Sequence, residues 1–505
     1  FKDVRNMFQN RYIRILLILV LGIIIPSVLF LIFPDAITDA GGFITADNLI
    51  KAVLGILFLC VYFYICMLGA YKFPILPLGV LFFYQIFQYL LNKFSPITFN
   101  YRILVLLFII PVILIVWNRE HLKNYLYPFL GLALFYLLNI VYAVVNYAHS
   151  PNFTYNLNLY LQKRDPLLPT IYSIDIFIFL TFLIIGVYLS VNLAMKESKK
   201  INYQLAVILL TFFIGAAFVS ILGFVASDLR FIEVVSGIKR LKGISSNSNL
   251  LGFLNVCVSL FLLRFFYFSK NDFLKNLTKL ALFLIYITTL LTFSRTNIAF
   301  LTMIYLFNFV VLSKNIMHTA FRVFGFVCVL GILFFTMDFI FSWGIVDRML
   351  ARFADQESSN YRPMLLEYLF SQQGFDLSII FGHGIGAASS TLFTLFSQRF
   401  DIANSPIIYH PHNSYVQIFF DYGLLGVVFY FSTLFAIAWR AFKNTINSRF
   451  MDINSLLLLE LVAFALVASL VDSYLMNVEI IPFWIILGIM YVNSLIVVRK
   501  EHVKA

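Results

Sequence analysis

Charged residues are scarce in this chain of 505 residues. Asp, Glu, Lys and Arg together make up 12% of it, whereas 61% of the residues are hydrophobic and 18% are aromatic. Soluble domains contain roughly 25% charged residues, so this composition excludes an ordinary soluble globular fold. The sequence therefore predicts an integral membrane protein.

Cysteine and the common catalytic motifs are also scarce or absent. The four cysteines lie in apolar runs, where they act as small apolar residues, and they form no C-x-x-C pair: Cys60, Cys66, Cys257 and Cys328. The sequence has no H-E-x-x-H motif, no phosphate-binding P-loop and no nucleophile elbow. Metal, nucleotide and acyl chemistry are therefore disfavoured, and no cofactor is expected.

Apolar runs of membrane-spanning length are abundant. A helix of about twenty apolar residues crosses the roughly 30 Å of hydrocarbon in a bilayer, and we count about fourteen such runs. They predict an all-α, polytopic transmembrane helix bundle with spans at 15–33, 50–71, 75–92, 101–117, 125–146, 171–195, 204–226, 248–268, 277–294, 296–313, 322–343, 413–439, 454–473 and 478–498. Two closely spaced pairs, 50–71 with 75–92 and 277–294 with 296–313, are also compatible with re-entrant helices.

The distribution of Lys and Arg predicts the orientation. These residues cluster in alternate loops, from Lys2 near the start to Lys500 near the end. Short cytoplasmic loops carry the positive excess, so both termini are expected in the cytoplasm. The formal net charge of +12 is then explained mainly by the cytoplasmic loops. We therefore expect contact with membrane lipids and no binding of nucleic acid.

Two loops on the predicted outer side break this charge rule. The loop at 227–247 carries Arg240 and Lys242, and the longest loop, 344–412, carries Arg362 and the glycine-rich run GHGIG at 382–386. Arginine forms paired hydrogen bonds with phosphate oxygens, so these side chains indicate an anionic ligand, and the glycines would let backbone amides approach it. The alternative is a pair of solvated loops with scattered charges and tight turns.

His412 is the candidate general base. It precedes Asn413 at the mouth of the expected span 413–439, and imidazole exchanges protons near neutral pH. A polar surface histidine is the alternative interpretation, and His410 and His383 compete for the same role.

Four short motifs resemble those of the O-antigen ligase and polymerase superfamily. The run HNSYVQIFFDYGLLG is similar to its H-N-x9-G-x-x-G signature, with His412, Asn413, Gly423 and Gly426 at the matching positions. Three further matches are an R-x3-L element at Arg362 and Leu366, an R-x2-G element at Arg240 and Gly243, and a Ser-Arg element at Ser294 and Arg295. The usual Asn-Pro-Asn of the family is replaced here by SNSN at 246–249.

The resemblance implies a metal-independent, inverting glycosyltransferase of the bacterial cytoplasmic membrane, with its active site on the outer face. Its donor would be a glycan on undecaprenyl diphosphate. Arg240 and Arg362 would bind the diphosphate of this donor. His412 would deprotonate the acceptor hydroxyl. Lys242, Arg295 and Asn413 would support the site.

The resemblance leaves the acceptor open. An O-antigen ligase, which we favour, transfers the glycan to lipid A core; a polymerase extends a growing glycan, and a protein O-oligosaccharyltransferase modifies Ser or Thr. A lipid-linked oligosaccharide flippase is the alternative from another class, supported by Asp175, Glu460 and Asp472 in or near spans. We expect N-terminal helices at 1–226, a catalytic region at 227–439, and C-terminal helices with a cytoplasmic tail at 440–505.

Overall fold

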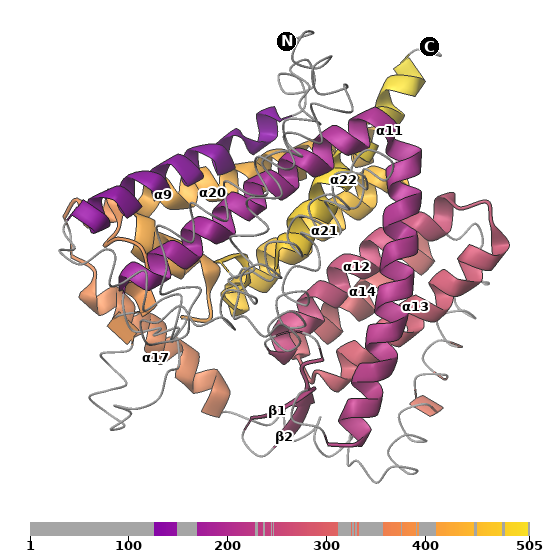
Figure 1. Cartoon of the computed structure of the whole chain (residues 1–505), viewed down its shortest axis with the longest axis horizontal. Coiled ribbons are helices and arrows are strands. Elements are labelled where there is room, and N and C mark those ends of the chain that lie inside the picture. The colour runs from indigo at the N-terminus through magenta and orange to yellow at the C-terminus, as the bar shows by residue number, and fades with distance from the viewer. Residues whose placement is uncertain are drawn as a thin grey trace, which may run out of the picture. The chain divides into compact units, whose positions relative to one another are not determined.

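A computed structural model describes the main helices of the chain (Figure 1). The described residues are 126–148, 169–227, 231–235, 238–243, 245, 247–311, 325, 328, 331–332, 357–374, 376–389, 391–392, 411–448, 452–476 and 480–502. In this part of the chain 85% of residues are helical, and five helices are long and apolar enough to cross a membrane, which confirms a helical integral membrane protein. The expected spans at 15–33, 50–71, 75–92 and 101–117, and nearly all of 322–343, lie outside the described residues.

The chain forms two compact units, residues 1–201 with 384–409 and residues 202–383 with 410–505. In the first unit, η1 (Tyr127–Phe129) leads into α9 (Leu130–Ala148). The Tyr136 hydroxyl of α9 lies 3.0 Å from Thr181 Oγ1 on the neighbouring helix α11.

Helix α11 (Pro169–Val225) corrects one expectation from the sequence. The segments expected as spans at 171–195 and 204–226 both lie in this continuous helix, and its part Ser198–Val225 is long and apolar enough to cross a membrane. Only the loop expected between the two spans is absent from these described residues. The connecting run Lys-Glu-Ser-Lys-Lys contains neither Pro nor Gly. Because Lys and Glu are good helix formers, nothing in this run ends the helix.

Helix α12 (Ser248–Phe268) lies at the centre of the second unit and is buried over most of its length. Its apolar side chains surround the helix on all sides, as expected for a helix inside a core. Asn255 Nδ2 donates hydrogen bonds to Oγ1 of Thr288 and Thr289, each at 3.1 Å. Helix α12 packs against α13 (Asp272–Leu291), α14 (Arg295–Val311), α21 (Ile453–Val471) and α22 (Ile481–His502) (Figure 1).

A β-hairpin occupies part of the region 227–247, which the sequence predicted to be a loop. Strands β1 (Ile232–Val235) and β2 (Ile238–Leu241) are antiparallel, with Ile232 opposite Leu241 and Glu233 opposite Arg240. Alternate residues of a strand face opposite sides, so Ile232 and Leu241 share one side of the hairpin and Glu233 and Arg240 share the other.

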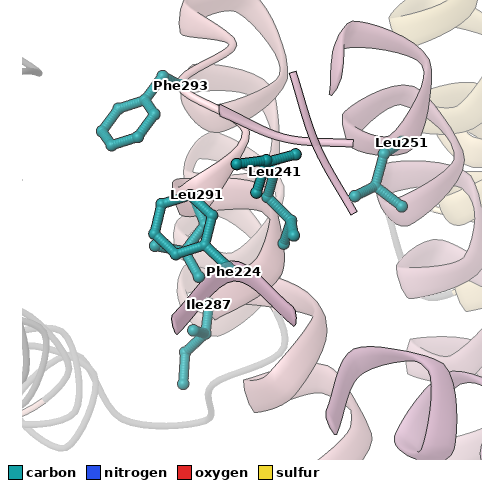
Figure 2. Close-up of a cluster of buried hydrophobic side chains, with 7 residues drawn as sticks. Phe224, Leu241, Leu251, Ile287, Leu291 and Phe293 are labelled. Carbon is teal, nitrogen blue, oxygen red and sulfur yellow. The ribbon is translucent and has the colours of Figure 1, made fainter. Parts of the chain in front are cut away.

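The side of the hairpin that carries Ile232 and Leu241 packs on helices α11, α12 and α13. Figure 2 shows the buried cluster, which consists of Phe224, Ile232, Leu241, Leu251, Ile287, Leu291 and Phe293. Burial of each such side chain contributes about 1.5–3 kcal/mol. The cluster therefore anchors the hairpin, and the charged pair Glu233 and Arg240 is held toward the first turn of α12.

Helix α20 (Ser414–Asn447) is broken at Gly423, whose φ is +66° and ψ is −164°. The chain between α18 (Ser378–Phe381) and His383 crosses α20 at this break, and His383 N donates to Phe420 O at 2.9 Å. A Cβ on Gly423 would lie 2.3 Å from Ile380 O. The first glycine of the G-x-x-G motif therefore permits a backbone crossing.

Gly382 lies at the same crossing. A Cβ on Gly382 would lie 2.4 Å from Asp421 O, and its φ of +76° also favours glycine. This contact corrects the interpretation of Gly382 in the GHGIG run: the glycine allows close packing on α20, instead of bringing its amide to a ligand.

Replacement of Gly423 by alanine is expected to destabilise the protein by about 2–6 kcal/mol. Backbone strain in this Gly-only region costs about 1–3 kcal/mol, and overlap with rigid neighbours costs about 1–3 kcal/mol. Thermal unfolding of the purified protein in detergent measures the change. Gly384→Ala is the matched control, since Gly384 also has a positive φ (+104°) but no atom within 4 Å of an added Cβ. Equal destabilisation by the two substitutions would contradict this role of the crossing.

Candidate active site

The N-terminus of α20 is joined to the end of α21. Asn413 caps α20, because its side-chain oxygen accepts hydrogen bonds from Tyr415 N at 3.0 Å and Val416 N at 3.1 Å. Its Nδ2 donates to Leu470 O at 3.1 Å. Asn413, which the sequence suggested as a supporting residue of the site, thus caps α20 and also joins it to α21.

Ser414 strengthens the same junction. Its hydroxyl donates to Asp472 O at 3.1 Å and accepts from Leu475 N at 3.2 Å. The turn that follows α21, including η2 (Tyr474–Met476), is therefore held against the start of α20.

His412 faces Asp472 at this junction. Its Nδ1 lies 3.2 Å from Asp472 Oδ1, and the side chains are 37% and 16% exposed. With a φ of +52°, His412 has a left-handed backbone, which is uncommon for residues other than glycine and is often found at functional sites. If Nδ1 carries the proton donated to Asp472, Nε2 is the ring nitrogen that accepts a proton.

Asp472 is held as a carboxylate. Burial raises its pKa, but the hydrogen bond and charge of His412, the Ser473 amide and the charge of Arg362 outweigh burial, so the pKa lies below its usual value. A carboxyl group with a lowered pKa stabilises the fold above its ordinary pKa of about 3.9, and this contribution is lost as pH falls through the lower folded value. Asp472 therefore remains an anion at neutral pH.

Arg240 lies behind Asp472 and is only 3% exposed. Its Nε donates to Thr292 O at 2.8 Å, its Nη2 donates to Asn249 Oδ1 at 2.6 Å, and its Nη1 lies 3.4 Å from Glu233 Oε1. Asn249 Nδ2 in turn donates to Asp472 Oδ2 at 3.0 Å. The sequence predicted an arginine in an exposed loop, but Arg240 is a buried strand residue with several partners inside the protein.

Arg362 approaches the same segment from α17 (Glu357–Gln372), where it is half-buried. Burial and the Asp472 carboxylate raise the pKa of Tyr474, while a hydrogen bond with Asn297 and the charges of Arg362 and Arg240 oppose them. Because both arginines interact electrostatically with Tyr474, the structure brings Arg240, Arg362 and His412 together around Asp472 and Tyr474.

The other candidate histidines have different surroundings. His383 Nε2 lies 3.1 Å from Gln373 Oε1, and its ring packs on Phe420 with centroids 4.5 Å apart. It therefore has partners of its own away from Asp472. His410 lies outside the described residues.

The remaining predicted supporting residues lie at element ends. Arg295 is the first residue of α14 and is half-buried. The neighbouring Ser294 hydroxyl accepts from Asn297 Nδ2 at 2.9 Å. Lys242 follows β2, and its backbone N donates to Phe231 O at 2.9 Å. Among the described residues, no group of three or more His, Cys, Asp or Glu side chains is arranged to hold a metal ion.

Two residues of the site were missed by sequence reasoning. Asp472 was interpreted as a residue that would support a flippase, and Asn249 was noted only as part of SNSN. The predicted topology contained a usable signal for Asp472, because span 454–473 ends on the same side of the membrane as span 413–439 begins.

Glu460, which the sequence also linked to transport, accepts hydrogen bonds from Asn308 Nδ2 at 3.1 and 2.9 Å, which joins α21 to α14.

A family model described as O-antigen ligase matches residues 280–431. The match confirms the resemblance to this superfamily, and it includes Arg295, Arg362, His412 and both motif glycines. It implies ligase activity of the glycosyltransferase kind and lipid-linked glycan substrates. No curated protein matches the chain.

Proposed function

We propose that the protein transfers a glycan from undecaprenyl diphosphate to an acceptor hydroxyl at the outer face of the bacterial cytoplasmic membrane. The observation that best supports this function is the contact of 3.2 Å between His412 Nδ1 and the Asp472 carboxylate, in a chain with an O-antigen ligase match. This contact favours the tautomer with a basic Nε2 and stabilises the imidazolium that forms when Nε2 takes a proton. We therefore extend the catalytic region from 227–439 to include Asp472.

The reaction is a displacement at the anomeric carbon. The acceptor oxygen forms a bond to that carbon as its proton moves to His412 Nε2, and the bond from the carbon to the diphosphate oxygen breaks. Undecaprenyl diphosphate leaves with the electron pair, and attack opposite the leaving group inverts the anomeric configuration. No other reactant is needed for the atoms and charges to balance.

Arg362 is the residue proposed to bind the diphosphate. It is half-buried near Asp472, and a guanidinium neutralises the charge that develops on the leaving oxygens without requiring a divalent metal. Arg240 was predicted to have the same role. The Arg240 side chain is only 4% exposed. We therefore propose that its positive charge acts from behind the site, without direct contact with the donor.

The proposed orientation predicts opposite accessibility at two exposed positions of the second unit. In a variant with all four cysteines replaced, a cysteine at Gln372 should react with a membrane-impermeant maleimide added to intact spheroplasts. A cysteine at Asn447, at the far end of α20, should react only after lysis. The basic residues near Asn447 are the reason to expect it in the cytoplasm. Protection at Gln372 with reaction at Asn447 would reverse the orientation.

The favoured acceptor is lipid A core, which makes the protein an O-antigen ligase. The sequence predicts about fourteen spans, more than the roughly twelve expected of such ligases, and this excess favours a repeat-unit polymerase instead. The two are separated by supplying proteoliposomes with a one-repeat glycan on undecaprenyl diphosphate, with and without lipid A core. We expect a single new product that requires the core. A ladder of longer lipid-linked glycans in the absence of core would refute the ligase and identify a polymerase.

A further inference from the structure

Asn249 bridges the buried arginine and the carboxylate that contacts His412. Its Oδ1 accepts from Arg240 Nη2 at 2.6 Å, and its Nδ2 donates to Asp472 Oδ2 at 3.0 Å. A guanidinium can only donate and a carboxylate can only accept, so the amide of Asn249 fits between them in one orientation. The bridge is therefore directional.

Asn249 and Arg240 are both fixed by further contacts. Asn249 O accepts from Asn297 Nδ2 at 2.7 Å. Arg240 is held by Thr292 O at 2.8 Å and by Glu233, which also accepts a hydrogen bond from the Ser248 hydroxyl. The donor that faces Asp472 thus belongs to a network that joins the hairpin to the starts of α12 and α14.

The two oxygens of Asp472 have different partners. Oδ2 accepts from Asn249, while Oδ1 accepts from Ser473 N at 2.9 Å and lies 3.2 Å from His412 Nδ1. With both oxygens engaged, the carboxylate cannot rotate without losing a hydrogen bond, and Oδ1 stays directed at the imidazole.

We propose that Asn249 is a positioning residue for the general base and that Arg240 acts on the reaction through it. Arg240 orients the Asn249 amide, the amide holds the Asp472 carboxylate, and the carboxylate orients His412. This inference rests on the proposed function of His412. It gives Arg240 an effect on turnover in place of direct binding of the donor diphosphate.

The first test compares two amide deletions on the same helix. Asn249→Leu removes the donor to Asp472, whereas Asn255→Leu removes an amide with two hydrogen bonds to threonines and none to the site. With the one-repeat lipid-linked glycan as donor, Asn249→Leu should lower kcat about tenfold to a hundredfold, the range seen when residues that orient metal ligands are removed. Its KM and its affinity for undecaprenyl diphosphate should stay near wild type. Asn255→Leu should retain wild-type kcat and KM.

The second test is a double-mutant cycle. If Asn249 acts through Asp472, Asn249→Leu should cause no further loss of kcat in an Asp472→Asn background. Arg240→Lys keeps the charge but loses the fork that orients the amide, so it should lower kcat with unchanged affinity for undecaprenyl diphosphate. If Asn249→Leu does not fold, Asn249→Ala, which removes the same amide donor without adding a charge, takes its place with the same expected losses.

Three results would overturn the inference: equal kcat values for Asn249→Leu and Asn255→Leu, multiplicative losses in the double mutant, or weaker undecaprenyl diphosphate binding with unchanged kcat in Arg240→Lys. Loss of turnover in His412→Ala alongside any of these would leave the proposed function intact. Full turnover in His412→Ala would instead overturn the proposed function, and the inference with it.

Discussion

Replacement of His412 by alanine is expected to lower glycan transfer about 100-fold to 10,000-fold, the usual contribution of a general base. Binding of the lipid-linked donor should remain near wild type, because the imidazole acts on the acceptor proton and not on the diphosphate. Initial rates at saturating donor and acceptor, together with the affinity for undecaprenyl diphosphate, measure the two effects.

His383→Ala is the matched control for His412. His383 is an exposed histidine of the same unit whose ring packs on Phe420 and lies beside Gln373, so its loss should leave most of the activity. His410 lies outside the described residues and needs its own substitution. Equal losses for His410→Ala and His412→Ala would show that the base is not His412 alone.

Arg362→Ala is expected to lower kcat about 100-fold to 1,000-fold, the loss seen when one preorganised donor that stabilises developing charge is removed. The half-buried guanidinium lies near Asp472, where the diphosphate would gain negative charge as it leaves. Arg362→Lys should recover only part of the rate, because lysine retains the charge but not the paired donors. Single-turnover rates with donor bound in advance separate this loss from weaker binding.

A matched comparison is available on the same helix. Glu367 lies five residues after Arg362 on α17, so Glu367→Ala also removes a charge from this helix. It should have little effect on transfer. Near-normal turnover in Arg362→Ala would contradict the diphosphate role, whatever the behaviour of Glu367→Ala.

Some helices of the second unit follow directly from the sequence. Span 248–268 is helix α12 with the same bounds, and spans 296–313 and 454–473 differ from α14 and α21 by a few residues at their ends. These segments are apolar runs between polar ends, and Asn247 and Asp452 cap α12 and α21. Composition and capping act locally, so the sequence is sufficient to predict them.

Features that depend on tertiary contacts were not predictable in the same way. The hairpin has strands of only four residues, which depend on burial of Ile232 and Leu241 against three helices. The break at Gly423 matches a glycine in a motif, but only the crossing chain near Ile380 explains it. Each case requires knowing which distant segment lies opposite.

The candidate site shows the same division. The motif around His412 located one end of the site. No local pattern indicated that the Asn249 amide would lie 3.0 Å from the Asp472 carboxylate, 223 residues away in the chain. Arg240 was selected for its chemistry, but its burial depends on Thr292 and Glu233, which come from two other elements. Side-chain chemistry can be read from sequence, whereas the partners of a side chain depend on the fold.

The most direct test of the proposed glycan transfer is the fate of the lipid carrier in a reconstituted reaction. Purified protein in proteoliposomes is given a one-repeat glycan on undecaprenyl diphosphate and lipid A core, and the lipids are quantified by mass spectrometry. We expect one undecaprenyl diphosphate to be released for each glycan transferred, release to require an acceptor, and His412→Ala to slow release about 100-fold or more. Movement of the intact lipid-linked glycan across the bilayer, with no undecaprenyl diphosphate released when acceptor is present, would contradict glycan transfer and indicate a flippase.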